Sequence, residues 1–115
     1  MKQEKLVSVI INAYNSEKFV SSAIESVLNQ SYSNFEIIFW DNKSNDHTSK
    51  IINKYTDNRI KYFLAKKHTS LGQARNFAIR EAKGEFIAFL DSDDLWLPNK
   101  LKLQIPLFNN PKIGL

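Results

Sequence analysis

Short apolar runs alternate along this chain with longer segments in which apolar residues recur every three or four positions. The longer segments are typical of amphipathic helices. Together, the two patterns predict β-α-β units and therefore an α/β fold with a mostly parallel sheet between two layers of helices, a Rossmann-like three-layer α/β/α sandwich. The apolar runs are typical of strands covered on both faces, and we expect four of them: Leu6 to Ile11, Phe35 to Trp40, Ile60 to Leu64 and Phe86 to Leu90.

Four helices are expected between and after these strands. Ser16 is a suitable N-cap for the first, and Gly84 stands where a left-handed C-terminal cap would end the third. Pro98 can begin the fourth in its first turn, and Pro106 should end or kink it. The expected helical ranges are about 16–28, 44–55 with Asp46 in its first turn, 71–83, and a short segment after 98.

Composition indicates one globular domain. The chain has 115 residues, of which 43% are hydrophobic and 24% charged. It has no cysteine, which excludes disulfides, thiolate metal sites and cysteine nucleophiles and fits a reducing compartment. The apolar run from Leu6 to Ile11 is too short for a signal-peptide core or a membrane span, so we expect a cytoplasmic protein.

The net charge is +4, from 16 basic and 12 acidic residues, and the lysines are scattered along the chain. A nucleic-acid-binding protein should show clustered Lys and Arg with interleaved aromatics or a known binding motif, and neither is present. We therefore expect no nucleic-acid partner. A diffuse positive excess is still compatible with attraction to phosphates or to an anionic membrane surface.

Three carboxylates lie within four residues at Asp91-Ser92-Asp93-Asp94, directly after the last apolar run. If Asp91 and Asp93 stay extended, their charges lie on one face and repel by about 2–3 kcal/mol. A hard cation such as Mg²⁺ or Mn²⁺ bound between the two carboxylates turns this repulsion into a net attraction, because both ions prefer carboxylate oxygens. Asp and Ser are also favoured in turns and caps, so a surface turn that caps the next helix is the alternative.

Polar residues follow every expected strand. In an open parallel sheet, ligands bind beyond the carboxyl ends of the strands, so four loops should contribute to one site, which favours the metal site over the turn. The residues are Asn12, Ala13, Tyr14 and Asn15 after the first strand, Asp41 and Asn42 after the second, Lys66, Lys67 and His68 after the third, and Asp91 to Asp94 after the fourth.

The low glycine content excludes the glycine-rich loops with which some folds bind the phosphates of a nucleotide. With only Gly72, Gly84 and Gly114, the chain has neither the Gly-x-Gly-x-x-Gly of a dinucleotide-binding fold nor a P-loop. A cation held by Asp93 and Asp91 could bridge a diphosphate and replace such a cradle. The sequence is therefore compatible with a nucleoside diphosphate held through a metal.

Tyr14 offers a flat aromatic face for a nucleotide base, and Asp41 or Asn42 could form hydrogen bonds with the edge of that base. Each residue also has a simpler structural interpretation. Tyr14 can be a core residue at a strand end, and Asn42 can belong to a turn.

Six segments of the chain match a known pattern, and the last two are the most specific. They are Val7 to Asn15, Ala23 to Tyr32, Phe35 to Ile38, Asp41 to Asp46, Leu71 to Asn76, and Gly84 to Asp94. On these residues the chain resembles the first half of a family 2 glycosyltransferase with a GT-A fold. The resemblance covers nearly the whole chain and implies a sheet with strand order 3-2-1-4.

The family transfers a sugar from a nucleoside diphosphate to an acceptor hydroxyl with inversion, usually with Mg²⁺ or Mn²⁺. The resemblance implies that Asp93 is a direct metal ligand, that Asp91 faces the ribose or the metal's water shell, and that Asp94 orients the sugar. It implies a UDP-sugar as donor. The other donor-binding residues that it implies are Asn12, Tyr14, Asn15, Asp41, Asn42, Arg75 and Ser92.

The resemblance also implies a glycan or lipid-linked acceptor and a role in cell-envelope polysaccharide biosynthesis at the inner face of the membrane. It implies that residues 1–115 are the nucleotide-sugar-binding part of a domain truncated at its C-terminus, where Ile113 to Leu115 resembles the start of a further strand. Such a truncation would expose surface that the second half normally covers, so a homodimer through that surface is expected.

Three features depart from the family pattern. Asn12 stands where many members have proline, and Asn42 replaces the second acidic residue of an Asp-Asp pair that in users of uridine donors contacts the base. The acceptor-binding half and the carboxylate that acts as general base follow this region in the family. Asp57 and Glu85 are poor substitutes for that base, so we expect no catalytic base in this chain.

Two other functions are compatible with the residues. The chain could be a donor-binding or interaction module without turnover, because the base is missing. It could also be a phosphatase of the haloacid-dehalogenase type, which uses an Asp-x-Asp at a strand end and forms a phosphoenzyme. In those enzymes the motif should follow the first strand, whereas here it follows the fourth.

Overall fold

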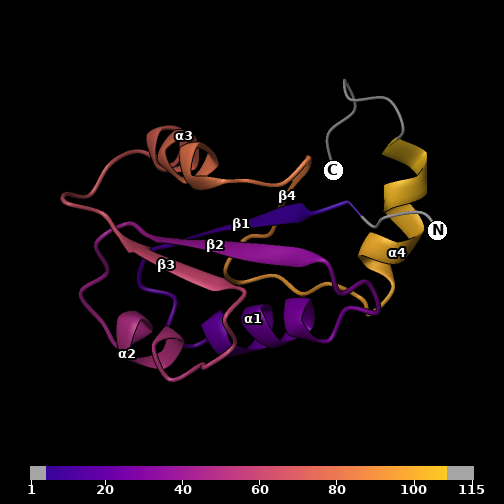
Figure 1. Cartoon of the computed structure of the whole chain (residues 1–115). Helices are drawn as coiled ribbons and strands as arrows, with labels where there is room; N and C mark the ends of the chain where they lie inside the picture. Colours follow the sequence, from indigo (N-terminus) through magenta and orange to yellow (C-terminus); the bar gives the residue numbers. More distant parts are fainter. Residues whose placement is uncertain (1–4, 109–115) are drawn as a thin grey trace.

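The computed structural model describes residues 5–108, which form a four-stranded sheet flanked by helices (Figure 1). The strand order is β3-β2-β1-β4 and every neighbouring pair is parallel, so the predicted class and order are confirmed. The strands are β1 (Val7–Ala13), β2 (Phe35–Asp41), β3 (Ile60–Leu64) and β4 (Phe86–Phe89). The helices are α1 (Val20–Leu28), α2 (Thr48–Ile52), α3 (Leu71–Glu81), α4 (Lys100–Gln104) and the 3-10 helix η1 (Ile105–Phe108).

Two helical layers cover the sheet, as predicted, with α1 and α2 on one side and α3 on the other (Figure 1). Because successive side chains of a strand point to opposite faces, each strand contributes to both layers of the core. The larger core lies on the side of α1 and includes Ile11, Ile24, Val27, Ile37 and Phe39. The smaller core lies beneath α3 and contains Ile10, Ile38 and Ala78.

Gly84 does not cap α3 in a left-handed conformation, contrary to our expectation. No glycine among the described residues has a positive φ, and α3 ends at Glu81 with Ala82 extended. Gly84 instead lies against β1, where its N–H donates to Ser8 Oγ at 2.7 Å. A Cβ at this position would lie 2.6 Å from the Ser8 backbone N, so glycine is required by close approach of two chain segments.

The first helix begins later than expected. α1 starts at Val20, and its N-cap residue, Phe19, makes no side-chain capping bond. Ser16 contributes only its carbonyl, which accepts hydrogen bonds from the N–H groups of Phe19 at 3.0 Å and Val20 at 2.9 Å. Residues 17–19 therefore form a turn rather than helix.

The second helix is shorter than the predicted 44–55. Asp41 Oδ1 accepts from the Ser44 N–H at 2.8 Å, and Asp46 Oδ1 accepts from the Thr48 N–H at 2.9 Å. Such local side-chain bonds compete with helical ones, so the segment from 42 to 47 stays a loop. Asp46 consequently precedes α2 and does not lie in its first turn.

The fourth helix also starts late, at Lys100 with Asn99 as N-cap, so Pro98 lies outside it. α4 ends at Gln104 and the 3-10 helix that contains Pro106 follows, as expected for a proline that stops an α-helix. The strand expected from Ile113 to Leu115 lies outside the described residues. Within residues 5–108 no helix combines the length and apolarity needed to cross a bilayer.

Candidate functional site

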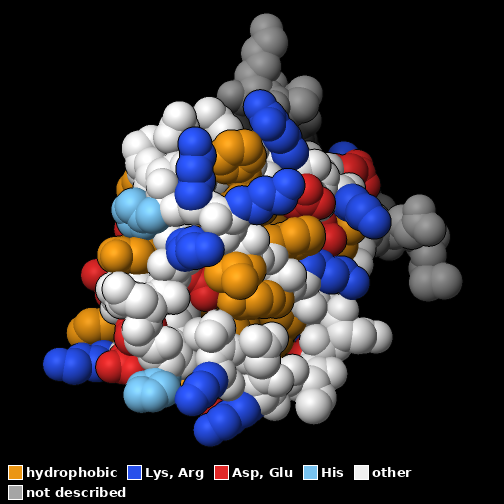
Figure 2. All heavy atoms as spheres, turned by 90° about the vertical axis from the view of Figure 1, so that its left-hand side faces the viewer, with side chains coloured by type: hydrophobic (Ala, Val, Ile, Leu, Met, Phe, Trp, Pro, Cys, Tyr) orange, Lys and Arg blue, Asp and Glu red, His pale blue; other side chains and the backbone are white. Residues whose placement is uncertain are grey.

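The loops that follow the four strands lie at one end of the sheet, which we call the carboxyl edge. It is the left-hand end in Figure 1, and Figure 2 faces it. Lysine and arginine side chains surround exposed hydrophobic side chains on this surface, with a few carboxylates between them (Figure 2). The predicted convergence of the loops is therefore present, and the edge is mainly basic.

Asn15 joins the loops that follow β1 and β2. Its Oδ1 accepts from the Asn45 N–H at 2.8 Å, and its own N–H donates to Ser44 Oγ at 2.9 Å. Its φ of 50° lies in the left-handed region, which asparagine tolerates better than most residues. Asn15 thus sets the relative position of two loops of the edge.

Asp41, the last residue of β2, is fully buried and both its carboxylate oxygens have protein partners. Oδ1 accepts from the Ser44 N–H and Oδ2 from the Tyr62 hydroxyl, both at 2.8 Å. Burial, followed by this hydrogen bond and the Asp41 charge, raises the pKa of Tyr62 well above its ordinary value. The buried Asp41 side chain therefore stabilises the loop after β2 through its hydrogen bond with Ser44.

A hollow of about 290 Å³ opens between the end of β1 and the loop before α3. We call it the Tyr14 hollow, because the Tyr14 ring lies on its wall, 4.3 Å from the His68 ring and tilted by 53°. The eight residues that line it are Asn12, Ala13, Tyr14, Asn42, His68, Thr69, Ser70 and Leu71.

Asn42 and His68 hold the loop that closes the Tyr14 hollow. The Asn42 side chain donates to the Thr69 carbonyl at 2.8 Å and accepts from the Thr69 N–H at 3.0 Å. His68 Nδ1 lies 3.0 Å from the Asn42 carbonyl oxygen. His68 was expected among the polar residues that follow β3 and does line the hollow, whereas Thr69 was not expected there; the two residues lie four and five positions after the end of β3.

Two buried side-chain atoms among the described residues have no hydrogen-bond partner, Asn12 Oδ1 and Trp40 Nε1. Asn12 lies opposite Trp40 in the register of β1 and β2. β1 runs two residues further than predicted, to Ala13, so Asn12 belongs to the sheet and not to the loop after it. Trp40 stacks between Phe63 and Phe77, and it lines a separate hollow on the α3 side.

Residues Asp91 to Asp94, the acidic loop, form a turn in which the Asp94 N–H donates to the Asp91 carbonyl at 3.0 Å. Asp91 and Asp93 are therefore not extended side by side, since the chain reverses between them. The turn does not cap α4, which begins six residues after Asp94. Ser92 Oγ lies 2.7 Å from Ser16 Oγ, so the acidic loop is tied to the loop after β1.

Among the described residues, Arg75 of α3 forms an ion pair with the acidic loop. Its Nη2 lies 3.7 Å from Asp91 Oδ1, and both side chains are partly exposed, at 42% and 67%. The guanidinium also lies 5.8 Å from the centre of the Phe89 ring. Arg75 thus brings a positive charge to the acidic end of the edge.

The carboxylates of the acidic loop suit a hard divalent cation. Asp91, Asp93 and Asp94 are all exposed, so their oxygens are accessible for coordination. Within residues 5–108, no three His, Cys, Asp or Glu side chains form a complete metal cage. Mg²⁺ is typically held by one or two carboxylates and completes its shell with water and phosphate, so this donor set fits such an ion.

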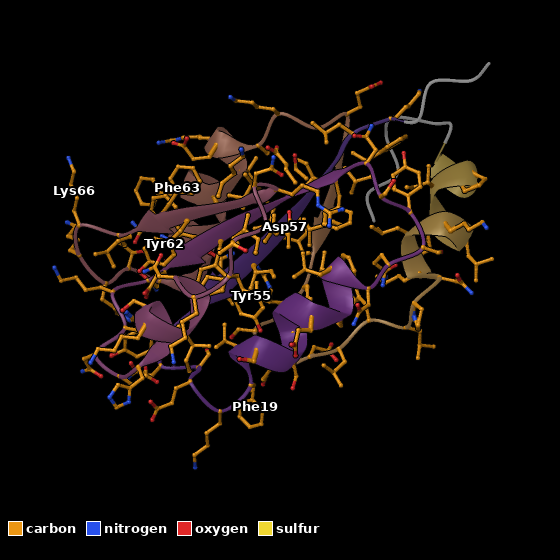
Figure 3. The ribbon with its side chains drawn as sticks, turned by 60° about the horizontal axis from the view of Figure 1, so that its bottom comes forward. Phe19, Tyr55, Asp57, Tyr62, Phe63 and Lys66 are labelled. Atoms are coloured by element: carbon orange, nitrogen blue, oxygen red, sulfur yellow. The ribbon has the colours of Figure 1, made fainter. Side chains whose placement is uncertain are left out.

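Asp57 and Glu85 lie at the opposite end of the sheet, before β3 and β4 respectively. Figure 3 shows Asp57 and Lys66 at opposite ends of β3. Asp57 is paired with Arg59, whose Nη2 lies 2.8 Å from Asp57 Oδ2. Neither carboxylate can therefore reach a ligand at the carboxyl edge.

The family model that matches this chain and its curated relatives are all of glycosyltransferases. The family model described as glycosyl transferase family 2 matches residues 8–114. Escherichia coli WfgD, a UDP-Glc:α-D-GlcNAc-diphosphoundecaprenol β-1,3-glucosyltransferase, is 44% identical over 102 residues. That alignment covers 89% of this chain and 40% of WfgD, so the chain spans less than half the length of this relative.

Two solved structures illustrate the fold. Staphylococcus aureus TarS in complex with UDP superimposes with a TM-score of 0.84 at 33% identity, over 90% of this chain and 32% of TarS. The Pyrobaculum calidifontis mannosyltransferase PcManGT, in complex with GDP-Man and Mn²⁺, superimposes with a TM-score of 0.83 at 24% identity. That superposition covers 94% of this chain and 33% of PcManGT.

Proposed function

Because this chain belongs to glycosyl transferase family 2 and has the GT-A fold, we propose that it is the donor-binding part of an inverting glycosyltransferase. Residues 1–115 would hold a nucleoside-diphosphate sugar, from which the sugar passes to an acceptor hydroxyl. The observation that carries the proposal is that the Tyr14 hollow and the acidic loop lie on the same edge, joined through Ser16 and Ser92.

The donor would lie along this edge with its base in the Tyr14 hollow. Tyr14 and His68 provide aromatic surface for the base, and Asn42 lines the hollow and holds Thr69 in place. Asp41 stabilises the neighbouring loop through its bond to Ser44. The exposed lysines of the edge attract the negatively charged diphosphate. UDP in TarS supports a uridine donor, because the folds superimpose over most of this chain.

The diphosphate would reach the acidic loop. Asp93 and Asp91 would hold Mg²⁺ or Mn²⁺, with Ser92 and Asp94 beside them and Arg75 contributing positive charge. When bound, such an ion supplies Lewis-acid stabilisation of the departing nucleoside diphosphate. The chain's own residues bind and orient the donor, so their contribution to the reaction is mainly positional.

The acceptor and the cellular context also belong to this proposal. The lipid-diphosphate acceptor in the name of WfgD supports a lipid-linked glycan acceptor and a role in cell-envelope polysaccharide synthesis. Work on such an acceptor would take place at the inner, cytoplasmic face of the membrane. A homodimer stays a prediction, and light scattering at high protein concentration tests it, since a monomer contradicts it.

Turnover requires a base that accepts the proton of the acceptor hydroxyl. Asp57 and Glu85 lie at the wrong end of the sheet for that task. We therefore expect residues 1–115 to bind the donor without transferring the sugar, because the resemblance to the family implies that the base lies outside this region.

Calorimetric titration with UDP, in Mn²⁺ and in excess EDTA, tests the donor-binding proposal. We expect UDP to bind in Mn²⁺ and to bind much more weakly in EDTA. Parallel titration with GDP compares the two bases that the solved structures contain. Equal affinity with and without Mn²⁺, or no binding of either nucleotide, contradicts the proposal.

A further inference from the structure

We propose that the surface between the end of β3 and α3 docks this protein on an anionic phospholipid membrane. The surface is the separate hollow that Trp40 lines, which we call the Trp40 hollow. The inference rests on the proposed function in one respect, because a lipid-linked acceptor lies in a membrane and the donor site has to be held beside it. None of the proposed metal ligands lines the Trp40 hollow.

The Trp40 hollow is an apolar surface that the fold leaves open to solvent. It has a volume of about 560 Å³, and its apolar side chains are those of Trp40, Leu64, Ala65 and Phe77. Leu64 is 57% exposed and Phe77 is 37% exposed, although both are large apolar residues. Large apolar side chains that gather at one exposed place favour a partner that removes them from water.

Positive charge surrounds this apolar surface. Lys66 and Lys67 line the hollow, and Lys43 Nζ donates to the Lys66 carbonyl at 3.2 Å. The Arg80 guanidinium lies 5.5 Å from the centre of the Phe77 ring. Figure 3 shows the Lys66 side chain extending away from the ribbon beyond the end of β3.

These four cations are not neutralised by the described part of the chain. None of them takes part in an ion pair there, and none of the described residues that line the Trp40 hollow is acidic. Each lysine or arginine near an anionic lipid leaflet adds to the attraction between protein and membrane. The charge of this surface is therefore complementary to an anionic bilayer.

The combination of apolar and basic side chains favours a bilayer over a protein partner. Apolar side chains enter the boundary between headgroups and acyl chains, while lysine side chains reach the phosphates on their flexible stems. A specific protein interface also needs hydrogen-bonding groups that fix its orientation. Among the described residues that line the Trp40 hollow, Thr69 alone has a hydroxyl or amide side chain.

Docking at this surface leaves the proposed donor site beside the membrane. Lys66 and Lys67 line the Trp40 hollow, His68 lines the Tyr14 hollow, and Thr69 lines both. The Asn42 side chain holds Thr69 through bonds of 2.8 and 3.0 Å. A bilayer against the Trp40 hollow therefore lies next to the donor without filling the Tyr14 hollow.

Flotation with lipid vesicles, in the absence of nucleotide, tests the docking surface. The wild-type chain should float with phosphatidylcholine vesicles that contain about 30% phosphatidylglycerol, and it should bind pure phosphatidylcholine vesicles at least about tenfold more weakly. Raising NaCl from about 0.05 M to about 0.5 M should release it, because salt screens the attraction. Equal binding to both kinds of vesicle, or no flotation at all, overturns the inference.

The double variant Lys66→Glu/Lys67→Glu should bind the anionic vesicles at least about tenfold more weakly, because it reverses two of the four charges. Lys61→Glu/Lys83→Glu is the matched control, which changes the net charge equally at exposed positions. Lys61 Nζ donates to the Asn58 carbonyl before β3, and Lys83 precedes β4, so both lie toward the other end of the sheet. The control should bind within about threefold of the wild type.

Leu64→Asn tests the apolar part of the surface and should weaken binding to the anionic vesicles by at least about threefold. Leu97→Asn is its control, because Leu97 is 80% exposed and lies outside the Trp40 hollow. Circular dichroism verifies that each variant is folded. If either test variant binds the vesicles as well as its control, the inference is overturned.

Two further measurements separate this inference from the alternatives. A dimer in light scattering that Leu64→Asn dissociates would assign the Trp40 hollow to a second copy of the chain and overturn the inference. Calorimetry of the wild-type chain with UDP tests the donor site independently. Flotation without UDP binding supports the docking surface and contradicts the proposed function, whereas UDP binding without flotation overturns only the docking surface.

Discussion

The hydroxyl oxygens of Ser16 and Ser92 lie 2.7 Å apart, although 76 residues separate them in the chain. Ser16 is 7% exposed and also donates to the Tyr14 carbonyl at 3.3 Å. The contact connects Ser16, which lies two residues after Tyr14, with the acidic loop. The geometry of the two ends of the proposed donor site is therefore coupled through one hydrogen bond.

Ser92→Ala should weaken this coupling. Loss of one hydrogen bond to a buried hydroxyl lowers the free energy of unfolding by about 1 kcal/mol, measured by urea denaturation. UDP affinity in Mn²⁺ should fall as well, because the acidic loop is less well positioned. Ser33→Ala, at an exposed position, should change neither quantity. Loss of stability without any loss of affinity would show that the contact is structural only.

Asp93→Asn should remove most of the effect of Mn²⁺ on UDP affinity, because the amide lacks the negative charge that holds the cation. Asp93 is exposed, so the melting temperature should stay close to that of the wild type. Calorimetry with and without Mn²⁺ measures the effect. Glu81→Gln changes the net charge equally on an exposed part of α3 and should keep the full response to Mn²⁺. A normal response in Asp93→Asn would exclude Asp93 as a ligand.

Gly84→Ala should destabilise the fold by about 1–3 kcal/mol, because the new Cβ would lie 2.6 Å from the Ser8 backbone N and 2.9 Å from the Leu6 carbonyl oxygen. Gly72→Ala is the matched control in α3. Apart from its chain neighbours and the backbone of its own helix, no atom lies within 4 Å of its Cβ position, and alanine favours helix over glycine, so stability should rise by about 0.5–1 kcal/mol. Chemical denaturation of both variants decides the comparison, and equal effects would contradict it.

Stability should fall in acid partly through Asp57. Hydrogen bonds and charge from Arg59 lower the pKa of Asp57 from its ordinary value of 3.8 to about 2. A lowered folded-state pKa means that the contribution is complete above about pH 4 and is lost as the pH falls from about 4 toward 2. The side chains of Asp57 and Arg59 are 26% and 32% exposed, so we expect about 1–2 kcal/mol after screening.

Asp57→Asn should flatten the acid limb of the stability profile, as measured by denaturation between pH 2 and pH 5. Glu85→Gln is the control, because the Lys5–Glu85 pair is 3.9 Å apart and more than half exposed. Such a pair contributes little, so its removal should leave the profile unchanged. An acid limb that Asp57→Asn leaves intact would contradict the assignment.

The hydrophobic pattern of the sequence was sufficient to predict the sheet and the two helical layers that cover it. Runs such as Phe35 to Trp40 are apolar on both sides of a strand, and only a sheet covered by two helical layers buries both faces. Errors concentrated at the ends of elements, where local polar bonds decide. Asp46 takes the Thr48 N–H that the predicted second helix would have bonded to the Ser44 carbonyl, and the helix is reduced to Thr48–Ile52.

The same sequence pattern identified which residues gather at the carboxyl edge, because parallel strands bring their carboxyl ends together. It could not determine which of their polar atoms remain free. Asn42 is engaged by Thr69, 27 residues away, and Asp41 by Tyr62, 21 residues away. Residue types and spacing determine the fold and the edge of the sheet at which the proposed site lies. The partners that the tertiary structure brings to each side chain decide which atoms a ligand can use, since a donor or acceptor already bound within the protein is exchanged only at a cost.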